Sequence, residues 1–276
     1  MHENTEWYKA EFIKRFGAVT RARGCYLYTQ KGVRVTDLYR ENAHALLGWG
    51  SEGGKAFRVL KNTIDRGQTG SFPTVYEKAF EKAALSLVSG YTHARWFFSK
   101  QTLLNALLPY AKNCTRWNPW AIGSAAGDTN ASTATDGAHA VFFPAPLPFA
   151  QAGYIALFSD AFSGAHTQAN VPSIPASEAC SAAFFNALSR ALYDLKRFCS
   201  EYTEKDFSAF DDVLLLYFKR CGPYLTPVTD KKNYRSFVLH CLDCALLVSP
   251  LYEENSIIPF GANPGDFIKL KRNPFV

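Results

Sequence analysis

Residues 99–102, with the sequence Ser-Lys-Gln-Thr, combine side chains that can bind an anion with a position at the start of a predicted helix. The first turn of a helix has N–H groups without helical partners and the positive end of the helix dipole, so it favours an anion. The side chains of Ser99, Gln101 and Thr102 can donate hydrogen bonds. The ammonium group of Lys100 can face a phosphate. An ordinary helix with Ser99 as its N-cap, which needs no ligand, fits the same residues.

Residues 48–54 form a second candidate, because four of these seven residues are glycine. Such a segment must be a loop, since the glycines would cost too much conformational entropy inside a helix or strand. A glycine loop lets the backbone approach a ligand closely, and we assign Gly48, Trp49 and Gly50 to the substrate side of a site. The alternative is a plain connection into the next helix. The loop is not a phosphate-binding P-loop, because Lys55 lacks the Gly-Lys-Ser/Thr context.

The remaining residues that could do chemistry do not have the spacing of a known site. Cys241 and Cys244 form a Cys-x-x-Cys pair on an apolar helix, where buried thiols are expected rather than a zinc or redox site. The 6 histidines show no metal-ligand spacing. The chain has no Gly-x-Ser-x-Gly motif of an α/β-hydrolase. We therefore predict no metal site and assign no catalytic residue.

Hydrophobic periodicity predicts the elements that must position these residues. Apolar residues at spacings of three and four predict helices over residues 5–17, 55–65, 75–89, 99–112, 178–202, 206–220 and 234–244. Apolar and alternating runs predict a hairpin over residues 25–38 and strands over residues 95–98, 138–143, 154–158 and 245–248. Loops are predicted over residues 123–137 and 163–177. The alternation of helices and strands is typical of an α/β protein.

Composition and charge exclude several classes of protein. The chain has 276 residues, of which 47% are apolar, so it can form one large or two small globular domains. Its net charge of +6 comes from 30 basic and 24 acidic residues without a basic run or stripe, so nucleic-acid binding is not expected. Seven cysteines, an odd number, do not indicate a disulfide framework in a chain of this size.

The expected location is the cytoplasm. Residues 1–6 are polar and lack the apolar region of a signal peptide, and the scattered cysteines fit a reducing compartment. The longest apolar stretch, residues 141–158, contains Pro144, Pro146 and Pro148, which cannot continue a helix across a membrane. We therefore predict no membrane span.

Residues 24–50 contain a glycine, two strand segments around Lys31 and Gly32, an aspartate at Asp37, and a Leu-Gly-Trp sequence at 47–49. This order resembles the beginning of the class III aminotransferases, which are fold type I enzymes that depend on pyridoxal 5′-phosphate. Residues 249–252 and 260–266 similarly resemble the small C-terminal domain of that class.

The resemblance implies a phosphate cradle at residues 97–102. Family members carry Ser-Gly-Thr-Glu-Ala at this helix start, and the glycine and threonine backbone cradles the cofactor phosphate. Ser99 keeps the family's serine. Lys100, Gln101 and Thr102 replace its glycine, threonine and glutamate. The close backbone approach that the glycine allows is therefore lost.

The resemblance also implies a lysine that this chain does not have in the expected place. Catalysis with pyridoxal phosphate needs a lysine that forms a Schiff base and an acidic partner for the pyridinium nitrogen. In the family the lysine follows a strand of the large domain, but residues 138–178 contain Asp160 and no lysine. Lys196 lies within a predicted helix, and Lys231 and Lys232 lie in the last quarter of the sequence.

We therefore predict an α/β protein with a contracted fold type I, three-layer domain over residues 66–199 and a small α+β domain formed by residues 1–65 and 200–276. The predicted function is that of an aminotransferase-like scaffold protein without canonical Schiff-base catalysis. Pyridoxal phosphate is a candidate cofactor at Ser99, Lys100, Gln101 and Thr102, not covalently bound. The alternatives are an atypical pyridoxal phosphate-dependent transferase or aminomutase, a binder of a phosphorylated small ligand, and a structural or protein-interaction module. The resemblance implies a homodimer.

Overall fold

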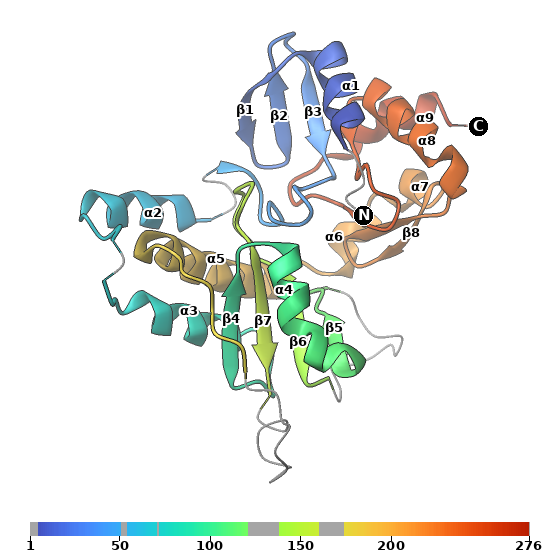
Figure 1. Ribbon diagram of the computed structural model, residues 1–276. Helices are drawn as coiled ribbons and strands as arrows, with labels where there is room; N and C mark the ends of the chain where they lie inside the picture. The colour runs from blue at the N-terminus through green and yellow to red at the C-terminus, as the bar shows by residue number, and fades with distance from the viewer. Residues whose placement is uncertain (1–4, 51–53, 71, 121–137, 160–173, 276) are drawn as a thin grey trace. The chain divides into compact units, whose positions relative to one another are not determined.

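The computed structural model describes residues 5–50, 54–70, 72–120, 138–159 and 174–275. The chain divides into two compact units, which are coloured blue with orange to red and cyan to yellow in Figure 1. Unit 1 comprises Met1–Gly53 and Glu201–Val276, and unit 2 comprises Gly54–Ser200. The division assigns the helix α2 (Ala56–Asp65) to unit 2, whereas the expected boundary lay after that helix.

Unit 1 contains a four-stranded sheet in the order β1-β2-β3-β10. The elements are α1 (Glu6–Phe16), β1 (Val19–Arg23), β2 (Tyr26–Thr29), β3 (Arg34–Asp37), α8 (Lys231–Asp243) and β10 (Leu246–Leu247). β2 pairs with β1 and β3 in antiparallel orientation, and β10 pairs with β3 in parallel. The structure confirms the predicted helix over 5–17 and the hairpin over 25–38. It adds β1, whose mostly exposed residues carry no hydrophobic signal.

The second sheet of unit 1 corrects the sequence prediction. Its order is β11-β9-β8, formed by β8 (Phe218–Cys221), β9 (Tyr224–Pro227) and β11 (Ser256–Ile257). The predicted helix over residues 206–220 was wrong: the chain forms α6 (Glu204–Ser208), α7 (Asp211–Leu214) and then β8. The sequence Gly222-Pro223 is the turn of the hairpin that joins β8 to β9.

The C-terminal segment of unit 1 is tied to the hairpin of β2 and β3. It contains the 3₁₀ helix η4 (Pro264–Phe267) and α9 (Ile268–Arg272). The carboxylate of Asp266 accepts a hydrogen bond from the Tyr26 hydroxyl at 2.8 Å and pairs with Arg34 at 3.0 Å. The guanidinium of Arg34 also lies over the Tyr26 ring, 4.3 Å from its centre. Asp266 of η4 therefore ties the C-terminal segment to the hairpin of β2 and β3.

Unit 2 contains a four-stranded sheet in the order β4-β7-β6-β5. Its strands are β4 (His93–Phe97), β5 (Cys114–Arg116), β6 (Ala140–Pro144) and β7 (Tyr154–Phe158). β7 is antiparallel to both β4 and β6, and β5 is parallel to β6. β4, β5 and β6 therefore run in the same direction, and their carboxyl ends meet at one edge of the sheet.

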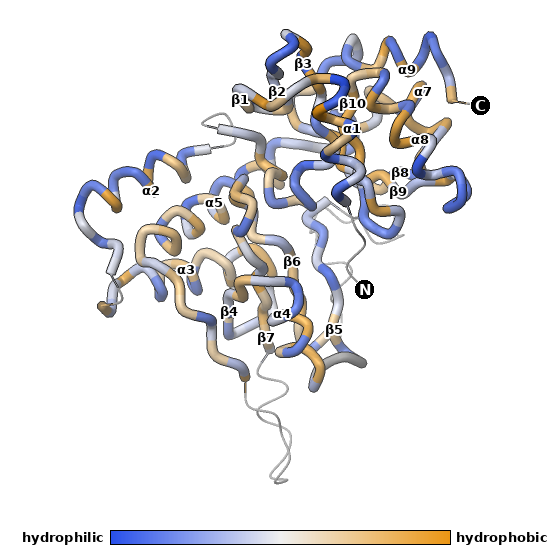
Figure 2. The backbone as a smooth tube through the Cα atoms, turned by 45° about the horizontal axis from the view of Figure 1, so that its top comes forward, coloured by the Kyte–Doolittle hydropathy of each residue, from blue (hydrophilic) through white to orange (hydrophobic). Residues whose placement is uncertain are grey.

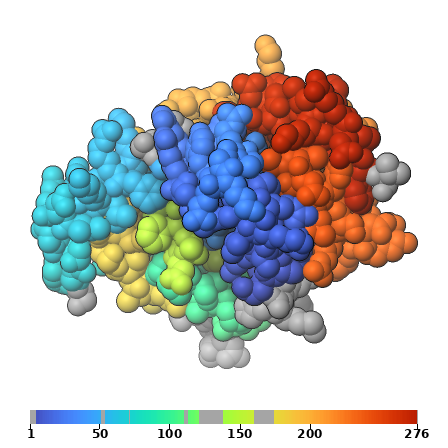
Figure 3. Space-filling model, turned by 90° about the horizontal axis from the view of Figure 1, so that it is seen from above, coloured from blue at the N-terminus to red at the C-terminus, as the bar shows by residue number. Residues whose placement is uncertain are grey.

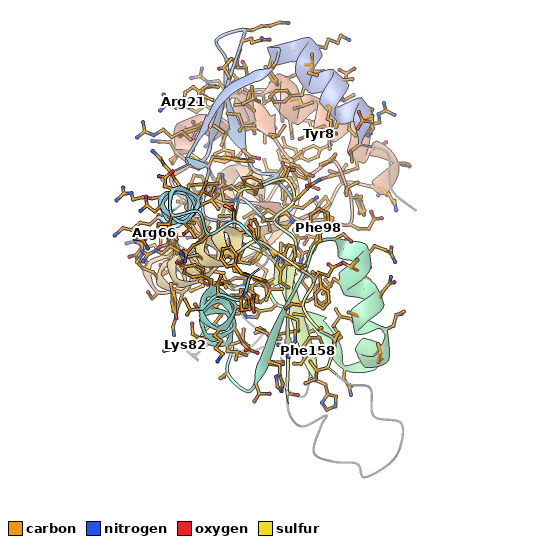
Figure 4. The ribbon with its side chains drawn as sticks, turned by 60° about the vertical axis from the view of Figure 1, so that its left-hand side comes forward. Tyr8, Arg21, Arg66, Lys82, Phe98 and Phe158 are labelled. Carbon is orange, nitrogen blue, oxygen red and sulfur yellow. The ribbon has the colours of Figure 1, made fainter. Side chains whose placement is uncertain are left out.

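Helices cover both faces of this sheet (Figures 1 and 4). α4 (Lys100–Leu107), continued by the 3₁₀ helix η2 (Leu108–Asn113), packs on one face. The core on that side consists of Phe97, Leu103, Leu107, Ala140, Ala156 and Phe158. α3 (Tyr76–Leu85) and α5 (Ala182–Glu201) cover the other face, where the Trp96 ring lies 5.9 Å from that of Phe184. Unit 2 is thus a three-layer domain.

The buried carboxylate of Asp194 fixes α2 onto α5 within unit 2. It accepts a hydrogen bond from the Lys55 N–H at 2.9 Å and pairs with Arg190 at 2.7 Å. Gly54 has φ +137°, and a Cβ there would collide with the Asp194 carboxylate, so only glycine fits. Along α2 hydrophilic and hydrophobic residues alternate in Figure 2, and its outer side chains form surface in Figure 3 (cyan).

The remaining predicted elements of unit 2 are present with shifted ends. The helices predicted over 75–89 and 178–202 correspond to the shorter α3 and α5, and the helix over 99–112 changes from α to 3₁₀ geometry after Leu107. The strands over 95–98, 138–143 and 154–158 correspond to β4, β6 and β7. Among the described residues, no helix has the length and apolar character that crossing a membrane requires.

Candidate functional site

The residues predicted to bind an anion lie at the carboxyl edge of the unit 2 sheet. Phe98 follows β4 directly and leads into α4, and Figure 4 shows it at the end of the sheet opposite Phe158. Ligands of open α/β sheets bind outside the carboxyl ends of the strands. The position of residues 99–102 therefore meets the geometric condition for a binding site.

Ser99 is the N-cap of α4. Its backbone is extended, with φ −131° and ψ 160°, and its hydroxyl accepts a hydrogen bond from the Thr102 N–H at 3.1 Å. The Thr102 hydroxyl in turn accepts from the Ser99 N–H at 3.2 Å, which completes a capping box. Lys100 and Gln101 are exposed, and the Gln101 amide donates to Asn105 at 3.0 Å. The polar groups of Ser99 and Thr102 thus stabilise the helix start itself.

Replacing Ser99 by alanine is expected to lower the free energy of unfolding by about 1 kcal/mol, because the Thr102 N–H loses its acceptor. Urea denaturation followed by circular dichroism measures this change. Ser208→Ala is the control, since Ser208 is exposed and donates only to a helix carbonyl. Equal effects of the two substitutions would show that Ser99 contributes no cap.

Glu178 brings a carboxylate to the start of α4 from a distant part of the sequence. Its Oε2 accepts hydrogen bonds from the Phe98 N–H and, at 2.9 Å, from the Thr102 hydroxyl. Sequence reasoning missed this contact, because it treated Glu178 only as the first residue of a helix. The two partners lie 80 and 76 residues away, and no local pattern marks such a pair.

The connection between β6 and β7 fills the same edge with apolar groups. After β6 the chain continues as Ala145-Pro146-Leu147-Pro148, and Ala145 and Leu147 are fully buried. Trp96 donates from its indole N–H to the Ala152 carbonyl at 2.8 Å. The chain has no lysine between residues 113 and 195. The end of β6 therefore carries a tight apolar turn instead of an amine.

Aromatic side chains follow β5 at the same edge. Trp117 is buried, and its backbone N–H donates a hydrogen bond to the Phe142 carbonyl at 2.9 Å. The centre of its ring lies 4.9 Å from that of Phe143. The candidate acidic residue Asp160 and the predicted loop over residues 123–137 lie outside the described residues. Within the described residues, no group of three His, Cys, Asp or Glu side chains could hold a metal ion.

Gly48, Trp49 and Gly50 belong to unit 1, whereas residues 99–102 belong to unit 2. Gly48 and Gly50 have φ +107° and +67°. The Trp49 backbone pairs with that of Gly24, and its indole N–H donates to the Asp37 carboxylate at 2.7 Å. The contacts of Trp49 therefore explain its place in the fold without a ligand.

The Asp37 carboxylate belongs to a buried polar cluster of unit 1. It accepts a hydrogen bond from the Arg40 N–H at 2.9 Å, and the Arg40 guanidinium, which is 0% exposed, donates to the Gly24 carbonyl at 3.1 Å. Burial raises the pKa of Asp37, although the charge of Arg40 opposes this shift. Burial likewise lowers the pKa of Arg40. Residues 40–43 all have positive φ, a conformation that is unfavourable for residues other than glycine.

A pocket of about 530 Å³ lies on the α3 side of unit 2. Its lining includes Phe72, Phe80, Glu81, Arg95, Ser177 and Glu178. The Arg95 guanidinium pairs with Glu81 at 3.0 Å and donates to the Pro175 carbonyl at 2.9 Å. Lys78 also lines this pocket and is exposed, so of its two basic groups the Arg95 guanidinium is already engaged within the chain.

The residues at the carboxyl edge do not fit covalently bound pyridoxal phosphate. No lysine follows β6, because the chain lacks lysine between residues 113 and 195. The start of α4, where the cofactor phosphate was expected, already receives the carboxylate of Glu178.

Comparison with known proteins identifies the fold. No model of a known protein family matches the chain. An uncharacterized protein of Treponema pallidum (strain Nichols) is 27% identical over 304 residues, with 92% of each chain covered. An uncharacterized protein of Borreliella burgdorferi is 22% identical over 265 residues, covering 96% of this chain and 93% of the relative.

Solved structures of several aminotransferases are similar to this chain. The ornithine aminotransferase of Plasmodium yoelii has a TM-score of 0.61 and 11% identity, with 98% of each chain covered. The acetylornithine aminotransferase of Elizabethkingia anophelis has a TM-score of 0.60 and 11% identity, covering 98% of this chain and 97% of that one. An omega-transaminase of Sphaerobacter thermophilus has a TM-score of 0.61 and 8% identity, covering 91% and 88%. The chain therefore has the α/β fold of the fold type I aminotransferases.

Proposed function

We propose that this chain is an aminotransferase-like scaffold protein that does not form a Schiff base with pyridoxal phosphate. The observation that carries the proposal is the connection after β6, where buried Ala145 and Leu147 lie in a stretch without lysine. A Schiff base requires an amine fixed next to the cofactor. This edge supplies apolar side chains in place of an amine.

The other lysines of unit 2 support the same proposal. All those whose side chains the structure describes are exposed: Lys55, Lys61, Lys78, Lys82, Lys100 and Lys196. A lysine activated for covalent chemistry is usually desolvated in a pocket, which lowers its pKa. None of these six lysines is buried, although Lys78 also lines the pocket on the α3 side.

The engaged polar groups at the start of α4 favour this proposal over the binder of a phosphorylated small ligand. Ser99 and Thr102 form hydrogen bonds with each other, and the Thr102 hydroxyl also donates a hydrogen bond to Glu178. A phosphate would have to displace this carboxylate before it could use the same hydroxyl and the Phe98 N–H. The homodimer and the cytoplasmic location stay predictions.

Titration of the purified protein with pyridoxal phosphate tests the proposal. We expect no change in the visible absorption spectrum beyond that produced by free lysine, and dialysis to remove the cofactor completely. A solution of free lysine at the same total lysine concentration is the control for reaction with exposed amines. A stable absorption band that appears at one equivalent of cofactor per chain and survives dialysis would contradict the proposal.

A further inference from the structure

Residues 174–181, which we name the edge strap, run along β4, one of the two edge strands of the unit 2 sheet. The Glu178 N–H donates to the Trp96 carbonyl at 3.0 Å, and the Trp96 N–H donates to the Ser177 hydroxyl at 3.1 Å. The Arg95 side chain donates to the Pro175 carbonyl at 2.9 Å. The strap therefore covers backbone groups of an edge strand that would otherwise face solvent.

These hydrogen bonds place the Glu178 carboxylate at the start of α4. Its Oε2 accepts hydrogen bonds from the Phe98 N–H and from the Thr102 hydroxyl. Phe98 is the residue before the N-cap, and Thr102 lies in the first turn of the helix. A backbone N–H and a hydroxyl at a helix start are the donors that an anionic ligand uses there. The helix dipole stabilises a negative charge at the same point.

We propose that Glu178 is the resident anion of the α4 helix start, and that it keeps this position closed to phosphate and phosphate-bearing ligands. The inference rests on the proposed function, since it explains why the phosphate cradle implied by the aminotransferase fold is not available in this chain. The carboxylate takes the role that a ligand's phosphate would have, and the edge strap holds it there.

Because Glu178 is part of the chain, its carboxylate has an advantage over a free anion in binding the Phe98 N–H and the Thr102 hydroxyl. A tethered group competes at an effective concentration in the millimolar range or above, set by the length and stiffness of its linker. Three hydrogen bonds fix the strap to β4 on the N-terminal side of the carboxylate. Free phosphate at lower concentrations therefore loses the competition for the same two donors.

Thermal unfolding in phosphate and in chloride at equal ionic strength tests this inference, with inorganic phosphate as the probe. We expect the wild-type Tm to be the same in both salts. Glu178→Ala is expected to unfold at a lower temperature in chloride and to regain part of its Tm in phosphate, with an apparent phosphate affinity at least about tenfold tighter than wild type. Glu77→Ala is the matched control, because Glu77 is an exposed glutamate of α3 whose side chain forms no hydrogen bond or ion pair with the described residues.

The added substitution Thr102→Val in the Glu178→Ala variant is expected to abolish the gain from phosphate, because it removes the hydroxyl that the anion would use. A wild-type protein stabilised by phosphate as strongly as Glu178→Ala would overturn the inference, and so would a Glu178→Ala variant without any gain. If Glu178→Ala does not fold, Glu178→Gln keeps the shape and removes the charge, and the same two outcomes apply to it.

Hydrogen exchange of the Phe98 amide provides a second readout on the wild-type chain. We expect this amide to be protected and to exchange at least about tenfold faster in Glu178→Gln, because a neutral amide oxygen is a weaker acceptor. Equal exchange rates would overturn the inference. Inorganic phosphate cannot form a Schiff base, so these measurements do not detect a lysine adduct. They can therefore contradict this inference without contradicting the proposed function, which is tested by looking for such an adduct.

Discussion

Replacing Asp37 by alanine is expected to lower the free energy of unfolding by about 3–5 kcal/mol, because it leaves the buried Arg40 without its negative neighbour. Asp37 and Arg40 are 1% and 0% exposed. The Asp37 carboxylate also accepts the Arg40 N–H at 2.9 Å and the Trp49 indole N–H at 2.7 Å. Its removal therefore leaves the charge of Arg40 without a negative neighbour, and the Arg40 N–H and Trp49 indole N–H without this acceptor, inside unit 1.

Urea denaturation followed by circular dichroism measures the loss, and two further variants separate its causes. Trp49→Phe removes a single donor to the carboxylate, so we expect a smaller loss of about 1.5–3 kcal/mol. Asp65→Ala, at an exposed aspartate, is expected to stay within about 0.5 kcal/mol of wild type. A loss below 1 kcal/mol for Asp37→Ala would refute the charged cluster as a determinant of stability.

Replacing Gly153 by alanine is expected to destabilise unit 2 by at least about 4 kcal/mol, because the new methyl group has no space at the start of β7. Gly153 has φ +76°, and a Cβ there would collide with the Phe97 carbonyl and lie 2.7 Å from the Trp96 indole nitrogen. Neither neighbour can move freely, since Phe97 belongs to the paired strand β4 and the Trp96 indole donates to Ala152.

Gly90→Ala separates the collision from the backbone strain. Gly90 has a similar φ of +88° but nothing within 4 Å of the added Cβ. Strain alone should therefore cost about 1–2 kcal/mol at this position. The midpoint of urea denaturation compares the two variants, and equal losses would show that the apolar turn between β6 and β7 is loosely packed.

The fold could be predicted largely from the sequence where local signals and tertiary packing agree. The hairpin over residues 25–38 combines alternating strand residues with a glycine turn, and the long stripe of α5 buries residues such as Leu188 and Leu192. The prediction failed at residues 206–220. There the apolar residues are compatible with helical spacing, but Phe218 pairs with Pro227 in β9 instead. Periodicity over a short apolar run cannot separate these alternatives.

The candidate site could be predicted only in part. The cap at Ser99 is a local feature, because the N-cap and Thr102 lie three residues apart, and the sequence is sufficient to propose it. The contact of Glu178 with Phe98 and Thr102 depends on how the edge strap lies along β4. Pairing between segments about 80 residues apart is set by tertiary packing, which a single sequence does not reveal.

Reductive trapping tests the central claim most directly. The protein is incubated with pyridoxal phosphate, reduced with borohydride and digested, and mass spectrometry then locates every lysine that carries the cofactor. The account predicts only scattered, substoichiometric labelling of exposed lysines such as Lys100 and Lys196, equal to that of the urea-unfolded chain. One lysine labelled at one cofactor per chain in the folded protein, and not in the unfolded chain, would contradict it.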